Sequence, residues 1–249
     1  MDSFITRIGG KKLLRDQIIA RFPTNFDRYI EVFGGAGWVL FRKDKHADLE
    51  VYNDFDQDLT NLFRCIKYHA PELQRELDWS LNSREFFYDA RAQQQVQGLT
   101  DIQRAARFFL LIKYSYGADQ HSFSCTKRST LPTIDDLKTV QERLDGVVIE
   151  CKDYEDLIKQ YDRLSALLYL DPPYWGTEDY YKGFAAVDHD RLYEVLHGIK
   201  GRFILSYNDC PKIREMYAGY NITEVSRCNN LRARYKDKEP YNELIITNY

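Results

Sequence analysis

An apolar run that ends at two prolines constrains this fold more than any other feature of the sequence. Residues 167–174 read Leu-Leu-Tyr-Leu-Asp-Pro-Pro-Tyr. Because proline cannot donate a hydrogen bond within a central ladder, a buried strand must end at Leu170. Asp171 and Tyr174 are then expected on a rigid turn at the carboxyl end of a strand, where open α/β sheets bind their ligands. A carboxylate, the Pro172 carbonyl and an aromatic ring together suit a planar amine; the alternative is an ordinary strand-to-loop turn.

A glycine-rich loop lies upstream, in the segment Glu31-Val-Phe-Gly-Gly-Ala-Gly37. Its three glycines within four residues permit a tight turn and a close approach of the backbone to a ligand. Leu40 occupies the position of the third glycine in the dinucleotide-binding fingerprint, so a nicotinamide dehydrogenase fits poorly. The next expected strand, 49–53, ends at Asp54, and an acid at that place usually contacts ribose hydroxyls.

The coarse pattern alternates strands and helices, except between residues 70 and 146. That alternation predicts an α/β fold with a mostly parallel sheet covered on both faces. The middle segment keeps helical spacing, for example at Ile134, Leu137 and Val140, and predicts an all-helical insert. We therefore expect a core from 1–69 and 147–249, with a helical insert from 70–146. The expected strands are 28–33, 49–53, 147–150, 166–170, 202–207, 220–225 and 242–248, and the expected helices are 10–21, 36–43, 56–69, 83–92, 101–114, 134–145, 154–160, 188–199 and 210–217.

Composition limits the partners that the chain is expected to have. The formal net charge is −3, so nucleic-acid binding would depend on a local basic face. The five cysteines form no Cys-x-x-Cys pair, which favours reduced thiols, an intracellular compartment and no metal site. No apolar stretch is long enough to span a membrane, and the amino terminus lacks a signal-peptide pattern, so we expect a cytoplasmic protein without membrane contact.

The order of these motifs resembles the Dam-like, alpha-class DNA adenine-N6 methyltransferases. The resemblance covers most of the chain and includes the Gly-Gly-Lys segment at 9–11, the glycine loop and Asp171 to Tyr174. Arg7 departs from the family, which often has an aromatic residue there, and Val32 stands where proline is common. The resemblance implies a Rossmann-like methyltransferase core with an inserted helical DNA-recognition lobe. It also implies transfer of a methyl group from S-adenosylmethionine to N6 of a flipped-out adenine.

The resemblance assigns roles to individual residues. Asp153 and Tyr154 would meet the cofactor adenine, although Asp153 could also simply cap a helix. The implied catalytic residues are Asp171, Pro172, Pro173 and Tyr174, and the implied cofactor-binding residues are Gly10, Lys11, Phe33, Gly34, Gly35, Gly37, Asp54, Asp153, Tyr154 and Asp171.

Two polar, basic segments are the candidates for DNA contact. The first, 113–130, is aromatic and basic, and it reads as a loop or hairpin able to reach base edges. The second, 227–238, carries a cluster of arginines and lysines that suits phosphates. Either segment could instead be a solvated surface loop. The candidate DNA-binding residues are Lys11, Lys113, Gln120, Lys127, Arg128, Arg232, Arg234 and Lys236.

Other functions remain open at this point. An N4-cytosine or glutamine methyltransferase would share the fold, but usually has Ser or Asn where this chain has Asp171. An RNA adenine methyltransferase keeps a similar tetrapeptide, and a catalytically silent DNA-binding regulator would keep the DNA lobe. We expect a prokaryotic or phage-encoded monomer that acts on double-stranded DNA, with or without a cognate restriction endonuclease. The sequence does not give the recognition site.

Overall fold

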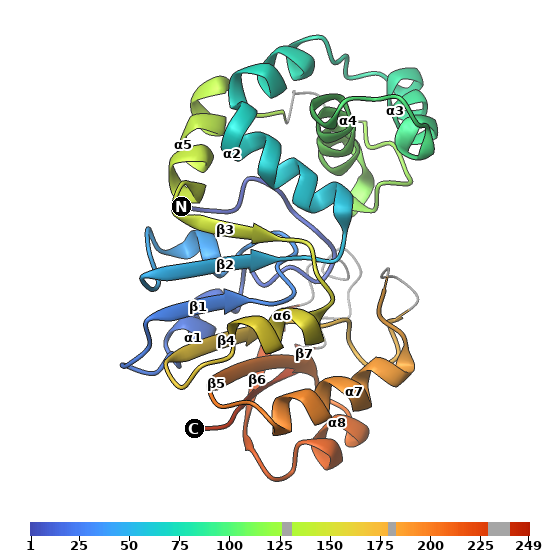
Figure 1. Cartoon of the computed structure of the whole chain (residues 1–249). Helices are drawn as coiled ribbons and strands as arrows, with labels where there is room; N and C mark the ends of the chain where they lie inside the picture. Colours follow the sequence, from blue (N-terminus) through green and yellow to red (C-terminus); the bar gives the residue numbers. More distant parts are fainter. Residues whose placement is uncertain (126–130, 179–182, 229–239) are drawn as a thin grey trace. The chain divides into compact units, whose positions relative to one another are not determined.

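The computed structural model describes residues 1–125, 131–178, 183–228 and 240–249, and these form two compact units. The sheet unit comprises residues 11–34, 45–55 and 150–249, and the helical unit comprises residues 1–10, 35–44 and 56–149. Figure 1 colours the chain from its amino to its carboxyl end. Each unit combines segments from distant parts of the sequence.

A seven-stranded sheet runs in the order β3-β2-β1-β4-β5-β7-β6. Neighbouring pairs among β2, β1, β4 and β5 are parallel, whereas β7 pairs antiparallel with β5 and with β6. Because β7 is antiparallel, its amino end lies at the same edge as the carboxyl ends of β4 and β5. The strands are β1 Arg28–Glu31, β2 Leu49–Asn53, β3 Val147–Glu150, β4 Ala166–Leu170, β5 Arg202–Asn208, β6 Asn221–Cys228 and β7 Pro240–Thr247.

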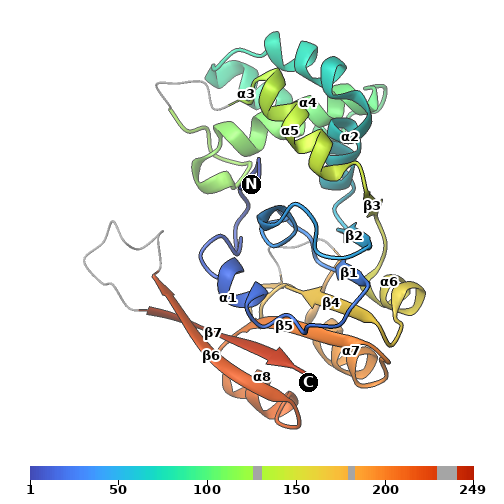
Figure 2. The same cartoon turned by 90° about the vertical axis from the view of Figure 1, so that its left-hand side faces the viewer.

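Helices of the sheet unit cover the sheet on both faces. Buried side chains of α6 (Tyr154–Tyr161), α7 (Ala186–His197) and α8 (Pro211–Met216) share one apolar core with the strands. Figure 2 shows these helices on one face and α1 (Arg15–Ile19) on the other. Strand β4 is buried along its whole length, as its run of Ala, Leu and Tyr requires.

The helical unit packs α2 (Gln57–Asp78) against α4 (Asp101–Tyr114) and α5 (Ile134–Leu144). Shorter elements are α3 (Arg84–Ala92) and three 3₁₀ turns, η1 (Leu40–Arg42), η2 (Gln93–Gln95) and η3 (Tyr116–Ala118). Thr100 and Thr133 begin α4 and α5 with reciprocal capping bonds. These caps fix the starts of the two helices at Asp101 and Ile134.

Several boundaries predicted from the sequence are wrong. The helix expected at 36–43 is only the short turn η1, since Gly37, three residues before that turn, has a φ of +67° that no helix allows. The helix expected at 10–21 reduces to α1. The helix expected at 56–69 continues to Asp78, because the chain bends at His69 and resumes helical geometry through Pro71.

Candidate active site

Asp171 leaves the carboxyl end of β4 and forms an ion pair with Lys11. The Lys11 ammonium lies 2.7 Å from Oδ1 and 2.8 Å from Oδ2, so it contacts both carboxylate oxygens. The Ser206 hydroxyl on β5 donates to Oδ1 at 2.8 Å. The Lys11 side chain is 4% exposed and that of Asp171 18%, so this pair is largely shielded from water. The structure thus brings together two predicted site residues that lie 160 positions apart in the sequence.

Glu243 completes this cluster, and the sequence analysis did not assign it a role. It lies near the amino end of β7, is fully buried, and places Oε2 3.8 Å from the Lys11 ammonium. The Tyr174 hydroxyl donates to the same oxygen. A glutamate inside the apolar pattern of residues 242–248 was the available signal, since a buried carboxylate requires partners.

The surroundings of Asp171 shift its pKa in opposite directions. Burial raises the pKa of Asp171, and the nearby Glu243 charge adds to the rise, whereas Lys11 and Ser206 lower it. Burial together with the charges of Asp171 and Glu243 also holds the pKa of Tyr174 well above its ordinary value, so the phenol stays protonated. Tyr174 is 8% exposed and the Lys11 ammonium lies 4.7 Å from its ring centroid. Only a small part of the ring is open to a ligand in this state.

Two contacts hold the turn that follows Asp171. The Asn208 side chain at the end of β5 accepts from the Trp175 backbone N–H at 3.1 Å and donates to the Trp175 carbonyl at 3.2 Å. Buried His189 lies between the Tyr207 hydroxyl and the Glu178 carboxylate, each 2.5 Å away. His189 belongs to α7 and therefore ties this segment to that helix.

Asn53 fastens the glycine loop to the sheet edge. Its amide donates to the Val32 carbonyl at 2.9 Å and to the Lys152 carbonyl at 3.1 Å, and its side-chain oxygen accepts from the Lys152 N–H at 2.8 Å. The Gly34 N–H donates to the Asn53 carbonyl at 2.7 Å. A Cβ on Gly34 would lie 2.2 Å from the Tyr52 ring, so this position requires glycine. Half-buried Asp54 follows directly after Asn53.

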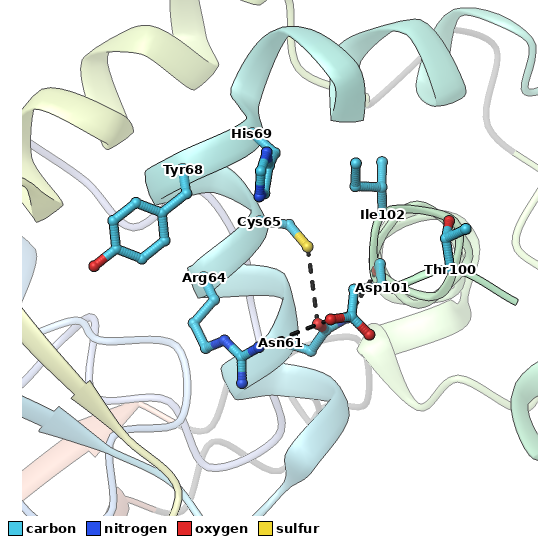
Figure 3. A pocket seen from close by; sticks show the side chains of 8 residues that line it. All are labelled: Asn61, Arg64, Cys65, Tyr68, His69, Thr100, Asp101 and Ile102. Atoms are coloured by element: carbon cyan, nitrogen blue, oxygen red, sulfur yellow. Dashed lines mark hydrogen bonds and ion pairs between the residues drawn. The ribbon is translucent and has the colours of Figure 1, made fainter.

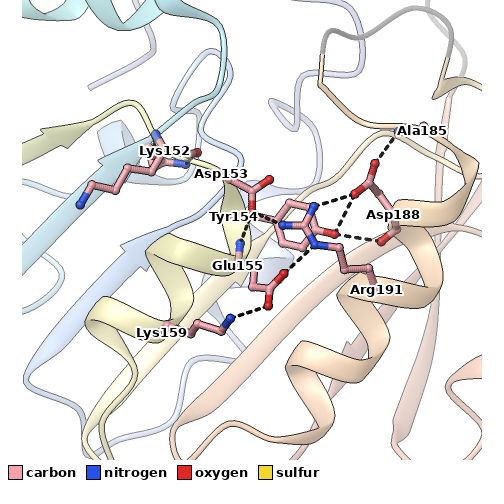
Figure 4. A network of polar contacts seen from close by, with 9 residues as sticks. Lys152, Asp153, Tyr154, Glu155, Lys159, Ala185, Asp188 and Arg191 are labelled. Carbon is pink, nitrogen blue, oxygen red and sulfur yellow. Dashed lines mark hydrogen bonds and ion pairs between the residues drawn. The ribbon is translucent and has the colours of Figure 1, made fainter.

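The predicted cofactor residues Asp153 and Tyr154 are held by Arg191 of α7 (Figure 4). Asp153 caps α6 by accepting from the Glu155 N–H at 2.9 Å, and it also pairs with Arg191. The guanidinium lies 4.5 Å from the Tyr154 ring centroid and bonds Asp188 at 3.0 Å. Phe33 packs against the same ring at a centroid distance of 5.5 Å. The helix-cap reading of Asp153 is therefore correct, and its contact with the cofactor adenine stays a prediction.

The other glycines singled out in the sequence belong to the helical unit. Gly35 and Gly37 have φ values of +51° and +67°, a backbone conformation that residues other than glycine rarely adopt. A Cβ on Gly10 would lie 2.8 Å from Trp38 Nε1, so the backbone packs closely there. Their part in cofactor binding stays a prediction.

The candidate DNA-contact residues fall partly within the described chain. Lys113 is half-buried at the end of α4, where burial lowers its pKa, and its ammonium lies 5.4 Å from the Phe109 ring centroid. Gln120 has a φ of +61° in a short hairpin closed by the bridge between Ser115 and Phe123. Residues 115–123 are thus a hairpin-like loop, whereas residues 113 and 114 of the expected loop belong to α4, and contact with base edges stays a prediction. Lys127, Arg128, Arg232, Arg234 and Lys236 lie outside the described residues.

A pocket of about 230 Å³ lies in the helical unit, and none of its lining residues has a role assigned above (Figure 3). It lies beside the bend in α2, between His69 and the start of α4. Burial raises the pKa of its Cys65 thiol to about 11, so that thiol is not a nucleophile at neutral pH. Its lining residues are Asn61, Arg64, Cys65, Tyr68, His69, Thr100, Asp101 and Ile102. Within the described residues no cluster of His, Cys, Asp and Glu could hold a metal ion.

Comparisons with known proteins assign the family. Residues 8–231 match the family model of the D12 class N6 adenine-specific DNA methyltransferases. The chain belongs to this family. This methyltransferase is 26% identical to a type II methyltransferase, M1.LlaDCHI, of Lactococcus lactis subsp. cremoris, over 97% of this chain and 93% of that one. It is 24% identical to a DNA adenine methylase of Haemophilus influenzae, over 95% and 91% of the two chains.

Two further observations accompany the assignment. A crystal structure of a precorrin 8w decarboxylase from Methanobacterium thermoautotrophicum overlays with a TM-score of 0.40 at 13% identity, covering 95% of this chain and 89% of that one. That overlay is too weak to bear on function. Among the helices described, none has the length and apolar character needed to cross a membrane. The function expected from the motifs, site-specific adenine methylation of DNA, is the function of the family.

Proposed function

We propose that this methyltransferase moves a methyl group from S-adenosylmethionine to N6 of an adenine that is flipped out of duplex DNA. The observation that carries the proposal is the shielded carboxylate of Asp171 on a rigid turn at the carboxyl end of β4. A stacked adenine cannot reach such a position, so the base must leave the helix, at a cost of about a few kcal/mol.

The proposed chemistry begins with the electronic problem of the target amine. The lone pair of an aryl amine is delocalised into the ring, so the nitrogen is a weak nucleophile. Asp171 and the Pro172 carbonyl are the proposed acceptors for its two N–H groups. Both hydrogen bonds strengthen as positive charge develops on nitrogen, so they stabilise the transition state more than the bound substrate. Tyr174 and Pro173 would line the base pocket.

The sheet unit also offers residues that fit S-adenosylmethionine. Half-buried Asp54 suits the ribose hydroxyls, the rings of Phe33 and Tyr154 suit the adenine, and the backbone at Gly34 suits a close approach. When bound, this cofactor supplies an electrophilic sulfonium methyl group. We assign Gly10, Lys11, Gly35, Gly37 and Asp153 to the same site on the basis of the family motifs.

We further propose that the segment 70–146 recognises DNA and that the enzyme acts as a monomer, with or without a restriction endonuclease partner. The helical composition of this segment and its hairpin at 115–123 support the assignment. Lys113 and Gln120 would contribute from the hairpin region, and the basic segment 227–238 would contact phosphates.

The test is transfer of a labelled methyl group from S-adenosylmethionine to unmethylated duplex DNA, with RNA of matched sequence as the alternative substrate. Calorimetry compares the binding of S-adenosylmethionine with that of NAD. We expect label in DNA as N6-methyladenine, and calorimetric binding of S-adenosylmethionine but not of NAD. Label in RNA alone would favour the RNA methyltransferase alternative. DNA binding without any transfer would favour a silent regulator.

A further inference from the structure

The mechanism proposed above assigns no role to Glu243, which is fully buried. Its carboxylate faces the Lys11 ammonium at 3.8 Å and accepts from the Tyr174 hydroxyl, and both contacts use Oε2. Paired with Asn208 of β5 and Val225 of β6, it lies inside the sheet and is not a surface residue. Buried carboxylates cost much desolvation energy, so one beside the candidate catalytic acid calls for an explanation.

The position of Lys11 creates a difficulty for catalysis. Its ammonium contacts both oxygens of Asp171, at 2.7 and 2.8 Å. A target amine becomes positively charged as the methyl group arrives, and a fixed cation on the accepting carboxylate would oppose that charge. Asp171 can assist transfer fully only when the ammonium has moved away from it.

We propose that Glu243 is a positioning residue that takes the Lys11 ammonium from Asp171 as the target amine arrives. This inference rests on the proposed function. The ammonium is already 3.8 Å from Glu243 Oε2, and a shift of about 1 Å would bring it to the ~2.8 Å typical of a charged hydrogen bond. Lysine has a flexible four-carbon stem, which permits such a shift while the cation stays paired. The Tyr174 hydroxyl fixes the receiving oxygen in place.

A purely structural role for Glu243 would give different results. If Glu243 only anchored Tyr174, then Tyr174→Phe would reproduce the effect of its loss. If it receives the ammonium, its negative charge matters in addition to its hydrogen-bonding ability. Glu243→Gln keeps an acceptor for Tyr174 but removes the charge, and Glu243→Asp keeps the charge. Glu224→Gln on β6 is the matched control, since that side chain is 68% exposed.

The experiment measures single-turnover methyl transfer to unmethylated duplex DNA, together with dissociation constants for S-adenosylmethionine and DNA. We expect Glu243→Gln to slow transfer about tenfold or more, less than the ~10²–10³ that loss of a directly contacting group costs. Both dissociation constants should stay within about twofold of wild type, Glu243→Asp should retain more activity than Glu243→Gln, and Glu224→Gln should match wild type.

A background lacking Lys11 provides the decisive comparison. In Lys11→Met, adding Glu243→Gln should cause no further loss of rate, because there is no ammonium left to receive. A wild-type rate in Glu243→Gln, equal losses in Glu243→Asp and Glu243→Gln, a loss matched by Tyr174→Phe, or full additivity with Lys11→Met would overturn the inference. Absence of transfer by the wild-type enzyme would instead reject the proposed function.

Discussion

Two clusters, each of which contains both positive and negative side chains, lie at the same edge of the sheet. They differ in their access to water. Lys11, Asp171 and Glu243 are 4%, 18% and 0% exposed at the side chain, whereas Arg191 is 39% exposed. Interactions between charges in a shielded site are strong because solvent hardly screens them, whereas water and salt weaken the interactions between exposed charges. Under the proposed function, the Lys11 cluster would serve the reaction and the Arg191 cluster would hold the shape of the proposed cofactor site.

The largest expected effect is on stability, in the variant Lys11→Met. Removing one partner of a buried ion pair usually costs about 3–5 kcal/mol, because the remaining charges are left uncompensated. The free energy of unfolding, measured in urea, should fall by that order. Burial already raises the pKa of Asp171, so this carboxyl can take up a proton once Lys11 is gone, and the loss should be greater at pH 8 than at pH 5. A loss below about 1 kcal/mol at both pH values would mean that water reaches the cluster.

The next effect is on the rate, in the variant Asp171→Ala. Loss of a group that stabilises developing charge typically costs ~10²–10³ in rate, so transfer should fall at least that far. Circular dichroism and the dissociation constant for DNA should be close to wild type. A rate within about tenfold of wild type would contradict the catalytic assignment of Asp171.

Arg191→Met should have a smaller effect, confined to cofactor binding. Its ion pairs with Asp153 and Glu155 are screened by solvent, so together with the contact to Tyr154 we expect about 0.5–1 kcal/mol, or roughly two- to fivefold in the dissociation constant. The effect should shrink in 1 M salt. Arg214→Met on α8 is the control, since this similarly exposed arginine pairs with Asp209, which precedes α8, and with Glu224 of β6. An equal change in the control would show a general charge effect.

The smallest expected effect is a pH shift in Ser206→Ala. The Ser206 hydroxyl favours the ionised form of Asp171, so its removal should raise the pKa of that carboxyl further. Transfer requires the carboxylate, so the rate should fall at a higher pH than in wild type when the solution is made acidic, while the plateau above neutral pH is retained. A pH–rate profile of single-turnover transfer measures this. An unchanged profile would mean that another group sets the acid limb.

The sequence by itself determined the elements that depend on local rules. The prolines after Leu170 ended β4, the threonines capped α4 and α5, and the alternation of strands and helices predicted the parallel sheet. Asp171 and Tyr174 could be proposed from the sequence because their turn is itself a local signal. A helix is predicted over 36–43 because the apolar residues there follow a helical pattern. The structure has only the short turn η1, since the backbone of Gly37 has a conformation that no helix contains.

Only the tertiary structure decided which charges meet. Lys11, Asp171 and Glu243 come from the chain start, β4 and β7, and no spacing rule connects them. They meet because β7 runs antiparallel to β5, which brings the amino end of β7 to the edge where β4 and β5 have their carboxyl ends. Asn53 at the end of β2 contacts the segments that follow β1 and β3, because these two strands are the neighbours of β2 in the sheet. Hydrogen bonds and ion pairs act over a few ångströms in space, whereas sequence patterns report only neighbours along the chain.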